Sequence, residues 1–113
     1  MTVAEARAAV IKAIKYAEDN GAVICNLSLT STTDDKALYE AMKNSGMLFV
    51  VAAGNGNPKT GKGVDTDVIP FYPAAYDLDN IISVANLSFD GHCPQAPTME
   101  KRLWILRRRE VIF

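Results

Sequence analysis

The sequence of 113 residues has few of the side chains that most metal and redox sites require. It contains two cysteines and one histidine. Cys25 lies in the apolar run AVICNLSL, where we expect a small buried residue, and Cys93 lies in a very different setting, so the pair does not indicate a disulfide framework. No stretch approaches the roughly 20 apolar residues that span a membrane. The N-terminus, MTVAEARAAV, has polar and acidic residues where a signal peptide would be apolar.

The charges are unevenly distributed along a chain whose net charge is only −1. Residues 1–92 carry 7 Lys and Arg and 11 Asp and Glu. Residues 93–113 carry 5 Lys and Arg and only 2 Asp and Glu. We therefore treat residues 93–113 as a separate basic tail. Its three adjacent arginines, 107–109, lack the fold context of a nucleic-acid site, so no nucleic-acid partner is expected. The length allows one domain with a modest core.

The pattern of apolar residues indicates two helices. We expect the first helix over residues 3–19, where Thr2 and Glu5 fit the T-x-x-E capping box at its start. We expect the second helix over residues 34–45, with two aspartates in its first turn, where the helix dipole favours them.

Three short apolar runs indicate strands, and the first of these should be buried on both faces. The predicted strands cover residues 22–29, 47–53 and 80–86. Strand, helix and strand with short connections form a βαβ unit, so the class is α/β and the strands should be parallel. Ligands bind beyond the carboxyl ends of such strands, where segments 28–30 and 54–56 lie. The connection over residues 54–79 is too long for a simple turn, which indicates a functional loop.

The loop GNGNPKTGKG, residues 54–63, has a partial similarity to a phosphate-binding loop. Gly56, Gly61 and Lys62 fit the pattern G-x-x-x-x-G-K, but the next residue is glycine rather than Ser or Thr. The segment that follows, GVDTDVIPFYP, contains two prolines and no helical period, although a phosphate site needs a helix there. A solvated surface loop explains this composition equally well. An anion-binding module that uses Lys59 and Lys62 is therefore the weakest functional alternative.

Four short segments, taken in order, resemble the subtilisin-like serine proteases, or subtilases. These segments are VICNLSL, LFVVAAGN, YPAAYDLDN and IISVAN. The resemblance covers about residues 3–91 and implies a three-layer fold around a parallel sheet, of which this chain would supply about three strands and two helices. It also implies hydrolysis of peptide bonds through a serine acyl-enzyme, a peptide or protein substrate, and a secreted or periplasmic location. It leaves the oligomeric state open.

The resemblance implies one catalytic residue, Asn55. In the family, the asparagine of A-A-G-N donates its side-chain amide to the oxyanion of the tetrahedral intermediate. A preorganised donor at that point stabilises the transition state more than the ground state. Without the resemblance, Asn55 would be interpreted as a turn residue that caps the end of a strand.

The segment of Ser28, Leu29 and Thr30 matches the S-L-G segment of the family. That segment pairs with the substrate backbone as a strand and lines the pocket for the residue before the scissile bond. Here Thr30 replaces the glycine and adds a side chain near the groove, which leaves the detailed substrate geometry open.

The opposite wall of the same pocket is matched by Ala52, Ala53 and Gly54. Small residues packed in a sheet would explain this segment equally well. The segment 72–74, Tyr-Pro-Ala, matches a part of the family near the pocket floor, and Phe71 directly before it is a candidate for partly closing the pocket.

The family requires no cofactor for its chemistry, but some members bind a structural cation. Main-chain carbonyls just after the Tyr-Pro-Ala segment bind it, and the matching residues here are Ala74 and Tyr76. Asp65 and Asp67 are further candidates for calcium, a cation that prefers oxygen ligands. Loop acids in solvent explain these two aspartates as well, so no metal ligand is assigned.

The chain lacks the motifs that carry the catalytic triad. Family members have an aspartate in D-[ST]-G, a histidine in H-G-T and a serine in G-T-S-M-A, and none of these occurs here. The single histidine, His92, lies in D-G-H-C. We therefore expect residues 1–92 to be the central part of a subtilase catalytic domain that is inactive on its own. The alternatives are a non-catalytic α/β fragment that binds extended peptides along residues 28–30, or the product of a degenerate gene.

The tail, residues 93–113, follows no family pattern. A shifted reading frame that begins near His92 and Cys93 would explain the change of both pattern and charge. The rival interpretation is a genuine basic tail, in which RLWILRRREVIF forms a short amphipathic helix that meets an acidic surface or an anionic membrane.

Overall fold

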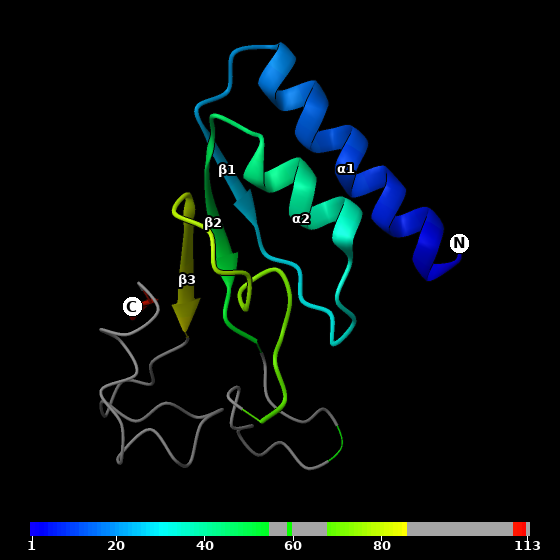
Figure 1. The fold of residues 1–113 in the computed structure, drawn as a ribbon, viewed down its shortest axis with the longest axis vertical. Helices are drawn as coiled ribbons and strands as arrows, with labels where there is room; N and C mark the ends of the chain where they lie inside the picture. The colour runs from blue at the N-terminus through cyan, green and yellow to red at the C-terminus, as the bar shows by residue number, and fades with distance from the viewer. Residues whose placement is uncertain (55–58, 60–67, 86–109, 113) are drawn as a thin grey trace.

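The computed structural model describes residues 1–54, 59, 68–85 and 110–112 (Figure 1). Its elements are, in order, α1 (Val3–Asp19), β1 (Ile24–Leu27), α2 (Lys36–Lys43), β2 (Leu48–Ala52), β3 (Ile81–Ala85) and β4 (Glu110–Ile112). The strands form one parallel sheet in the order β1-β2-β3-β4. The α/β class and the parallel βαβ arrangement that the sequence predicts are confirmed.

Helix α1 covers the predicted residues because local contacts determine both of its ends. The Thr2 hydroxyl accepts the N–H of Glu5 at 3.2 Å, and the N–H of Thr2 donates to the Glu5 carboxylate at 2.6 Å, so the capping box forms. At the other end, the main-chain N–H of Asn20 donates to the carbonyl of Tyr16 at 3.1 Å. Gly21 follows with a φ of 83°, a left-handed conformation that favours glycine.

Helix α2 is shorter than the predicted range 34–45. Asp35 is its N-cap and lies outside the first turn, since its Oδ1 accepts the N–H groups of Ala37 at 2.9 Å and Leu38 at 3.2 Å. The helix ends at its C-cap, Asn44. The predicted first-turn position of the aspartates is wrong, because a short acidic side chain satisfies the free N–H groups of a helix best from the capping position.

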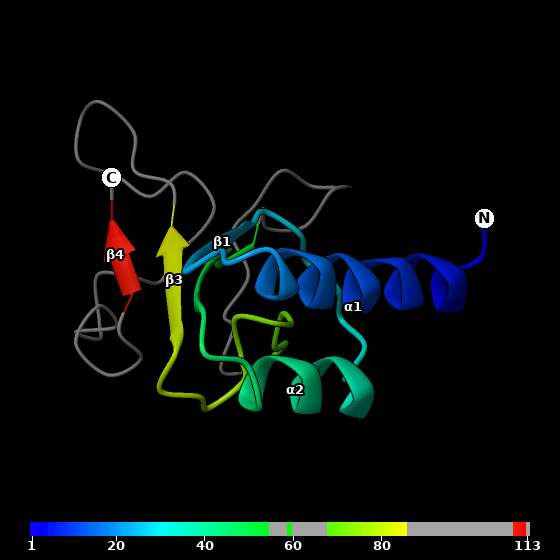
Figure 2. The ribbon, with the colours of Figure 1, turned by 90° about the horizontal axis from the view of Figure 1, so that it is seen from above.

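The core lies between the two helices and one face of the sheet. Residues that pair across parallel strands share a face, and this face carries Phe49, Val51 and Ile81. Ile14 of α1 and Met42 of α2 complete the buried cluster. Figure 2 shows the two helices side by side, which agrees with their direct contact. The amphipathic faces of both helices are therefore used to cover the same side of the sheet.

Neither described helix covers the opposite face of the sheet. Leu48 and Val50 of β2 and Val84 of β3 are half-buried on this face, and Ile24 of β1 is 60% exposed. The prediction that the first strand is buried on both faces is wrong, because β1 is the edge strand of the described sheet. Parallel sheets in α/β proteins are normally covered on both faces. The described residues thus supply one of the two helical layers that such a sheet needs.

Strand β4 was not expected from the sequence. Glu110–Ile112 pair in parallel with residues 83–85 of β3. These three residues are therefore extended and do not belong to the amphipathic helix suggested for the tail. Three residues are too few for periodicity to separate a strand from other structures. The proposed change of reading frame near His92 lies outside the described residues.

Asn80, directly before β3, joins three parts of the fold. Its Nδ2 donates to the carbonyl oxygens of Met42 at 2.9 Å, Ser45 at 3.3 Å and Met47 at 3.1 Å. Its own main-chain carbonyl accepts the N–H of Phe49 at 2.8 Å. One side chain therefore satisfies carbonyl groups at the end of α2 and at the entry to β2.

Candidate functional site

The carboxyl ends of β1 and β2 bring two predicted binding segments side by side. Leu27 pairs with Val51 in parallel register, so segment 28–30 leaves β1 next to the point where segment 52–54 leaves β2. The N–H of Ala53 still donates to a carbonyl of β3 at 2.9 Å, which fixes the second segment to the sheet. The two segments thus share the edge of the sheet at which open α/β folds bind ligands.

Segment 28–30 offers main-chain groups that the described fold does not use. All three residues are exposed, and Leu29 is 49% exposed. The hydroxyl of Ser28 donates to Oδ1 of Asn26 at 3.3 Å. The main-chain groups of Leu29 and Thr30 make no hydrogen bond with another described residue. Free N–H and C=O groups at an exposed position can pair with an added peptide strand.

A pair of hydrogen bonds brings the Tyr-Pro-Ala segment to the same place. The N–H of Ser31 donates to the carbonyl of Tyr72 at 2.9 Å, and the N–H of Tyr72 donates to the carbonyl of Ser31 at 2.7 Å. The peptide bond between Tyr72 and Pro73 is cis, and Pro73 is buried. Tyr72 therefore lies beside Ser31, the residue that directly follows segment 28–30.

Tyr76 anchors this segment to the helical layer. Its hydroxyl donates to the carbonyl of Asp35 at 2.8 Å and accepts the N–H of Asp35 at 3.1 Å. Its ring packs against those of Tyr39 and Tyr72, with centroid distances of 5.3 and 5.1 Å. Burial raises the pKa of Tyr76, and the hydrogen bond to the Asp35 backbone opposes part of this effect. These contacts hold Tyr72 in position relative to the sheet.

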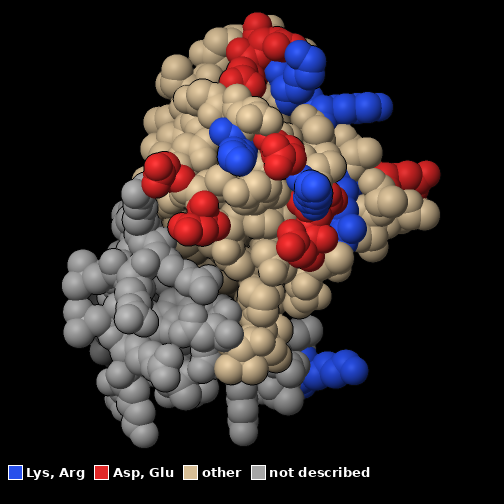
Figure 3. Space-filling view, viewed as in Figure 1, with Lys and Arg blue, Asp and Glu red and all other residues tan. Residues whose placement is uncertain are grey.

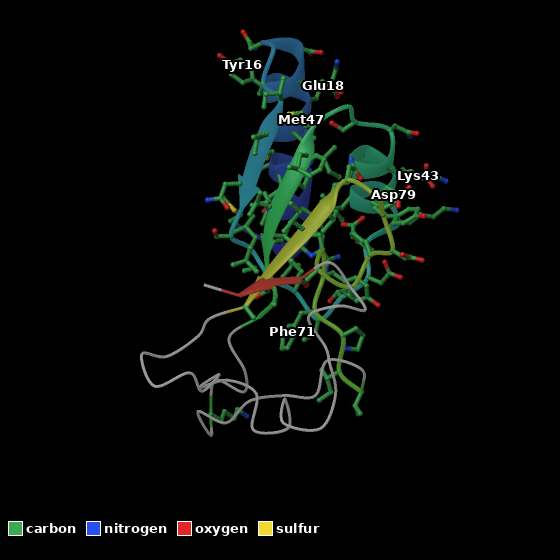
Figure 4. All side chains as sticks on the ribbon, turned by 90° about the vertical axis from the view of Figure 1, so that its left-hand side faces the viewer. Tyr16, Glu18, Lys43, Met47, Phe71 and Asp79 are labelled. Atoms are coloured by element: carbon green, nitrogen blue, oxygen red, sulfur yellow. The ribbon has the colours of Figure 1, made fainter. Side chains whose placement is uncertain are left out.

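Phe71 packs against Gly54 at the end of the second segment. Gly54 has a φ of 132°, which residues with a side chain rarely adopt. A Cβ atom at this position would lie 2.9 Å from Cδ2 of Phe71 and 3.2 Å from its Cε2. Figure 4 shows Phe71 beyond the end of the sheet toward which the strands run. The ring of Phe71 thus occupies the space beside the Gly54 main chain.

Asn55, the predicted oxyanion donor, lies outside the described residues, as do Lys62, Asp65 and Asp67. Lys59 is described and exposed. After β2, the continuous main chain that the structure describes ends at Gly54. The roles of Asn55 and of the loop lysines therefore stay predictions.

Metal ligands are not gathered in the described part of the chain. No group of three or more His, Cys, Asp or Glu side chains there could hold an ion. The carbonyl of Tyr76, one of the two predicted cation ligands, accepts the N–H of Leu78 at 3.1 Å. None of the described helices has the length and apolar character needed to cross a membrane.

The surface of the helices carries charges of both signs. Figure 3 shows Lys and Arg side chains interspersed with Asp and Glu over this face. Within the described helices and their caps, Arg7 pairs with Asp35 at 3.6 Å and Lys15 with Asp19 at 2.9 Å. This face therefore has no surface of a single charge that would select a charged polymer.

Two residues that shape the site were not predicted in these roles. Ser31 follows the predicted segment directly, but its partner, Tyr72, lies far along the chain and no local pattern connects them. Tyr76 was predicted only as a carbonyl ligand, and no local pattern indicates its ring contacts with Tyr39 and Tyr72, because residues 72–76 are not helical. Cys25 is half-buried against the core rather than fully buried, and burial raises the pKa of its thiol.

The comparison of the sequence with protein families identifies the family of this chain. The model of the Subtilase family matches residues 5–99. Thermitase from Thermoactinomyces vulgaris is 37% identical over 81 residues, which are 69% of this chain and 25% of Thermitase. The chain therefore spans about a quarter of the length of this relative.

Two solved structures are similar to the described fold. "Crystal structure of MycP1 with the N-terminal propeptide removed" matches with a TM-score of 0.59 and 21% identity, over 85% of this chain and 39% of that chain. "S41 Psychrophilic Protease" matches with a TM-score of 0.54 and 28% identity, over 77% of this chain and 30% of that chain. The similarity to the MycP1 structure, at 21% identity, shows the fold alone. The family model, in contrast, matches most of the sequence. This chain belongs to the subtilase family.

Proposed function

We propose that the chain contributes one part of the substrate groove of a serine endopeptidase that cleaves peptide bonds through an acyl-enzyme. Membership of the subtilase family supports this activity for the whole protein. The observation that carries the proposal is the meeting of segments 28–30 and 52–54 at the carboxyl ends of β1 and β2. Segment 28–30 has free main-chain groups with which a peptide strand can pair. Segment 52–54 consists only of residues with small or no side chains.

Each segment has a distinct role in this proposal. The main chain of Ser28, Leu29 and Thr30 pairs with the substrate backbone, and segment 52–54 forms a wall of the pocket for the residue before the scissile bond. Asn55 donates its side-chain amide to the oxyanion, where negative charge develops in the transition state. The glycine that precedes Asn55 supports this role, because its positive φ lets the main chain leave the path of the strand at that point.

The chain by itself should not hydrolyse peptides. Its sequence has none of the motifs that carry the nucleophile, the general base or the aspartate that orients the base. The chemistry needs no cofactor, so we propose that any calcium in the whole protein has a structural role. A fluorophosphonate probe, which reacts with activated serines, should leave the purified chain unlabelled. Labelling of the chain would show that a nucleophile is present after all.

The groove itself can be tested without catalysis. Titration of the isotope-labelled chain with an extended tetrapeptide amide should shift the NMR signals of the Leu29, Thr30 and Ala53 amides. Thr30→Pro, which removes the main-chain N–H, should weaken binding, whereas Thr30→Ala, which keeps it, should leave binding nearly unchanged. Shifts confined to other residues would contradict the proposed groove.

A second candidate is a non-catalytic peptide-binding protein that uses the same segments. The free main-chain groups of Leu29 and Thr30 favour it, and it does not need the missing triad motifs. Sequencing the coding DNA past codon 80, with translation in all three frames, separates the two candidates. A G-T-S-M-A motif in another frame would support the endopeptidase, and its absence from every frame would support the binding protein.

A further inference from the structure

We propose that the outer edge of β3 is a peptide-binding site, which the chain fills with its own strand β4. The site accepts an extended segment in parallel orientation, and Glu110–Ile112 occupy it in the structure. It lies on the opposite side of β2 from β1, so it is separate from the groove at segments 28–30 and 52–54. The inference therefore does not rest on the proposed function.

The main chain of β3 has hydrogen-bonding groups on the side that faces away from β2. The carbonyl of Val84 accepts the N–H of Ala53 at 2.9 Å, so the main-chain groups of Val84 are directed toward β2. Successive residues of a strand direct their main-chain groups to opposite sides, so those of Ser83 and Ala85 face away from β2. Both residues are buried, and buried main-chain groups need hydrogen-bond partners. This side of β3 therefore requires a neighbouring strand.

Strand β4 supplies that neighbour. It pairs in parallel register with the last three residues of β3, and Figure 2 shows the two strands running in the same direction. Val111 lies opposite Val84, so its main-chain groups face those of Ser83 and Ala85. Ile112 directs its N–H to the other side, where the described sheet has no further strand. One residue of β4 thus makes the central contacts with β3.

Strand β4 is held by fewer contacts than the other strands of the sheet. It has three residues, whereas β2 and β3 have five each. Its partner is also distant along the chain, since β3 ends at Ala85 and β4 begins at Glu110. A short strand offers few main-chain hydrogen bonds, and closing a long connection costs conformational entropy. A free peptide can therefore compete with β4 for the edge of β3.

The class of ligand follows from strand addition. Main-chain hydrogen bonds provide the affinity for an extended peptide, and its alternate side chains provide the selectivity. The segment that occupies the edge, Glu-Val-Ile, contains two β-branched residues, which favour extended structure. We therefore expect the edge to prefer short apolar peptides with β-branched residues over peptides with proline, which lacks the N–H that a strand donates.

Two proline variants of the full chain separate the site from the strand that occupies it. Val111→Pro removes an N–H that faces β3, whereas Ile112→Pro removes one that faces away, so only the first should release β4. The probe is the peptide acetyl-Arg-Glu-Val-Ile-Phe amide, and NMR of the isotope-labelled chain follows the amides of Ser83 and Ala85. The peptide should bind Val111→Pro at least about tenfold more tightly than the unmodified chain or Ile112→Pro, because only an unoccupied edge is available to it.

Several outcomes of this titration would overturn the inference. Equal affinity for Val111→Pro and the unmodified chain would show that β4 does not block a site. Equal affinity for the two proline variants would show that the N–H facing β3 does not hold β4. An absence of shifts at Ser83 and Ala85 in Val111→Pro would show that the edge binds no peptide. Shifts confined to the Leu29 amide would also contradict the inference, but they would support the groove of the proposed function.

Hydrogen exchange of the unmodified chain tests the inference without a variant, and it decides if Val111→Pro does not fold. Release of β4 frees the amides of Ser83 and Ala85, whereas the amides of Ile82 and Val84 stay paired with β2. The first pair should therefore exchange at least about tenfold faster than the second pair. Equal protection of the two pairs would show that β4 does not open separately from the sheet, which would overturn the inference.

Discussion

At the scale of single residues, two polar side chains join the helices to the sheet. The amide of Asn80 reaches three carbonyl groups between Met42 and Met47, and the hydroxyl of Tyr76 binds both main-chain groups of Asp35. Both sets of contacts connect parts of the chain that are more than 30 positions apart. Changes at these residues should therefore affect tertiary stability while leaving the intrinsic propensity of the helices unchanged.

Replacing Asn80 by aspartate should strongly destabilise the chain. Asn80→Asp keeps the shape of the side chain but sets a carboxylate against three carbonyl oxygens that now lie 2.9 to 3.3 Å from an amide donor. We expect Asn80→Ala to lower the free energy of unfolding by about 1–3 kcal/mol, and Asn80→Asp to lower it further, because the charged group meets no donor. Urea unfolding at neutral pH measures the free energy of unfolding of both variants. An Asn80→Asp variant as stable as the unmodified chain would show that the amide does not stabilise the fold.

Tyr76 should make the stability depend on pH in the alkaline range. Burial is the main cause that raises the pKa of Tyr76 in the folded chain, so the folded state holds this proton more tightly than the unfolded state. Its contribution to stability is therefore complete below the unfolded pKa of about 10 and is lost as the pH rises through the folded pKa. Tyr76→Phe should cost about 1 kcal/mol at neutral pH, because the contacts with Asp35 are lost, and should reduce this alkaline decline.

Urea unfolding at several pH values, with Tyr16→Phe as the control, measures this effect. Tyr16 is 71% exposed, so its replacement should leave both the stability at neutral pH and the alkaline decline close to those of the unmodified chain. An alkaline decline of equal size in Tyr76→Phe and Tyr16→Phe would contradict the assignment.

At the scale of elements, the ends of the helices depend on their capping residues. Asp35 accepts the N–H groups of Ala37 and Leu38 and also lies 3.6 Å from the guanidinium of Arg7. Asp35→Ala should lower the free energy of unfolding by about 0.5–2 kcal/mol, whereas Asp35→Asn keeps the cap and should stay close to the unmodified chain. Thermal unfolding of the two variants measures this difference. An equal loss in both would assign the effect to the ion pair with Arg7 instead of the cap.

The elements that the sequence predicts well are those fixed by neighbouring residues. The range of α1 follows from the Thr2–Glu5 capping box and the Asn20-Gly21 pair, all of them local signals. The burial of β1 could not be predicted in the same way, because it depends on which elements cover its second face. Strand β4 has only three residues and a distant partner, so no local pattern marks it.

The candidate site also combines features that the sequence predicts with features that depend on distant parts of the chain. Segments 28–30 and 52–54 could be placed together because the carboxyl ends of parallel strands meet at one edge of the sheet. That Phe71 partly closes a substrate pocket is implied only by the family resemblance and stays a prediction. Its contact with Gly54 needed the three-dimensional structure, because a long loop separates the two residues along the chain.

At the scale of the whole molecule, the described sheet has one covered face and one that no described helix covers. The core between α1, α2 and the sheet is continuous, and its largest residues are fully buried. On the other face, Ile24 is 60% exposed at the edge strand. An apolar face next to an open edge is a surface on which further chain segments or other molecules can pack. The isolated chain should therefore associate with itself.

Changing one residue on β1 tests this expectation. Ile24→Glu places a charge on the uncovered face at the sheet edge, where charged side chains oppose strand pairing. In sedimentation velocity measurements, the unmodified chain should form larger species as its concentration rises, and Ile24→Glu should reduce this association. Val3→Glu is the matched control, because Val3 is 65% exposed at the start of α1, away from the sheet, and the helix dipole favours an acid there. A monomeric unmodified chain at every concentration would contradict the prediction. Equal suppression by both variants would assign the association to low net charge rather than to the exposed sheet.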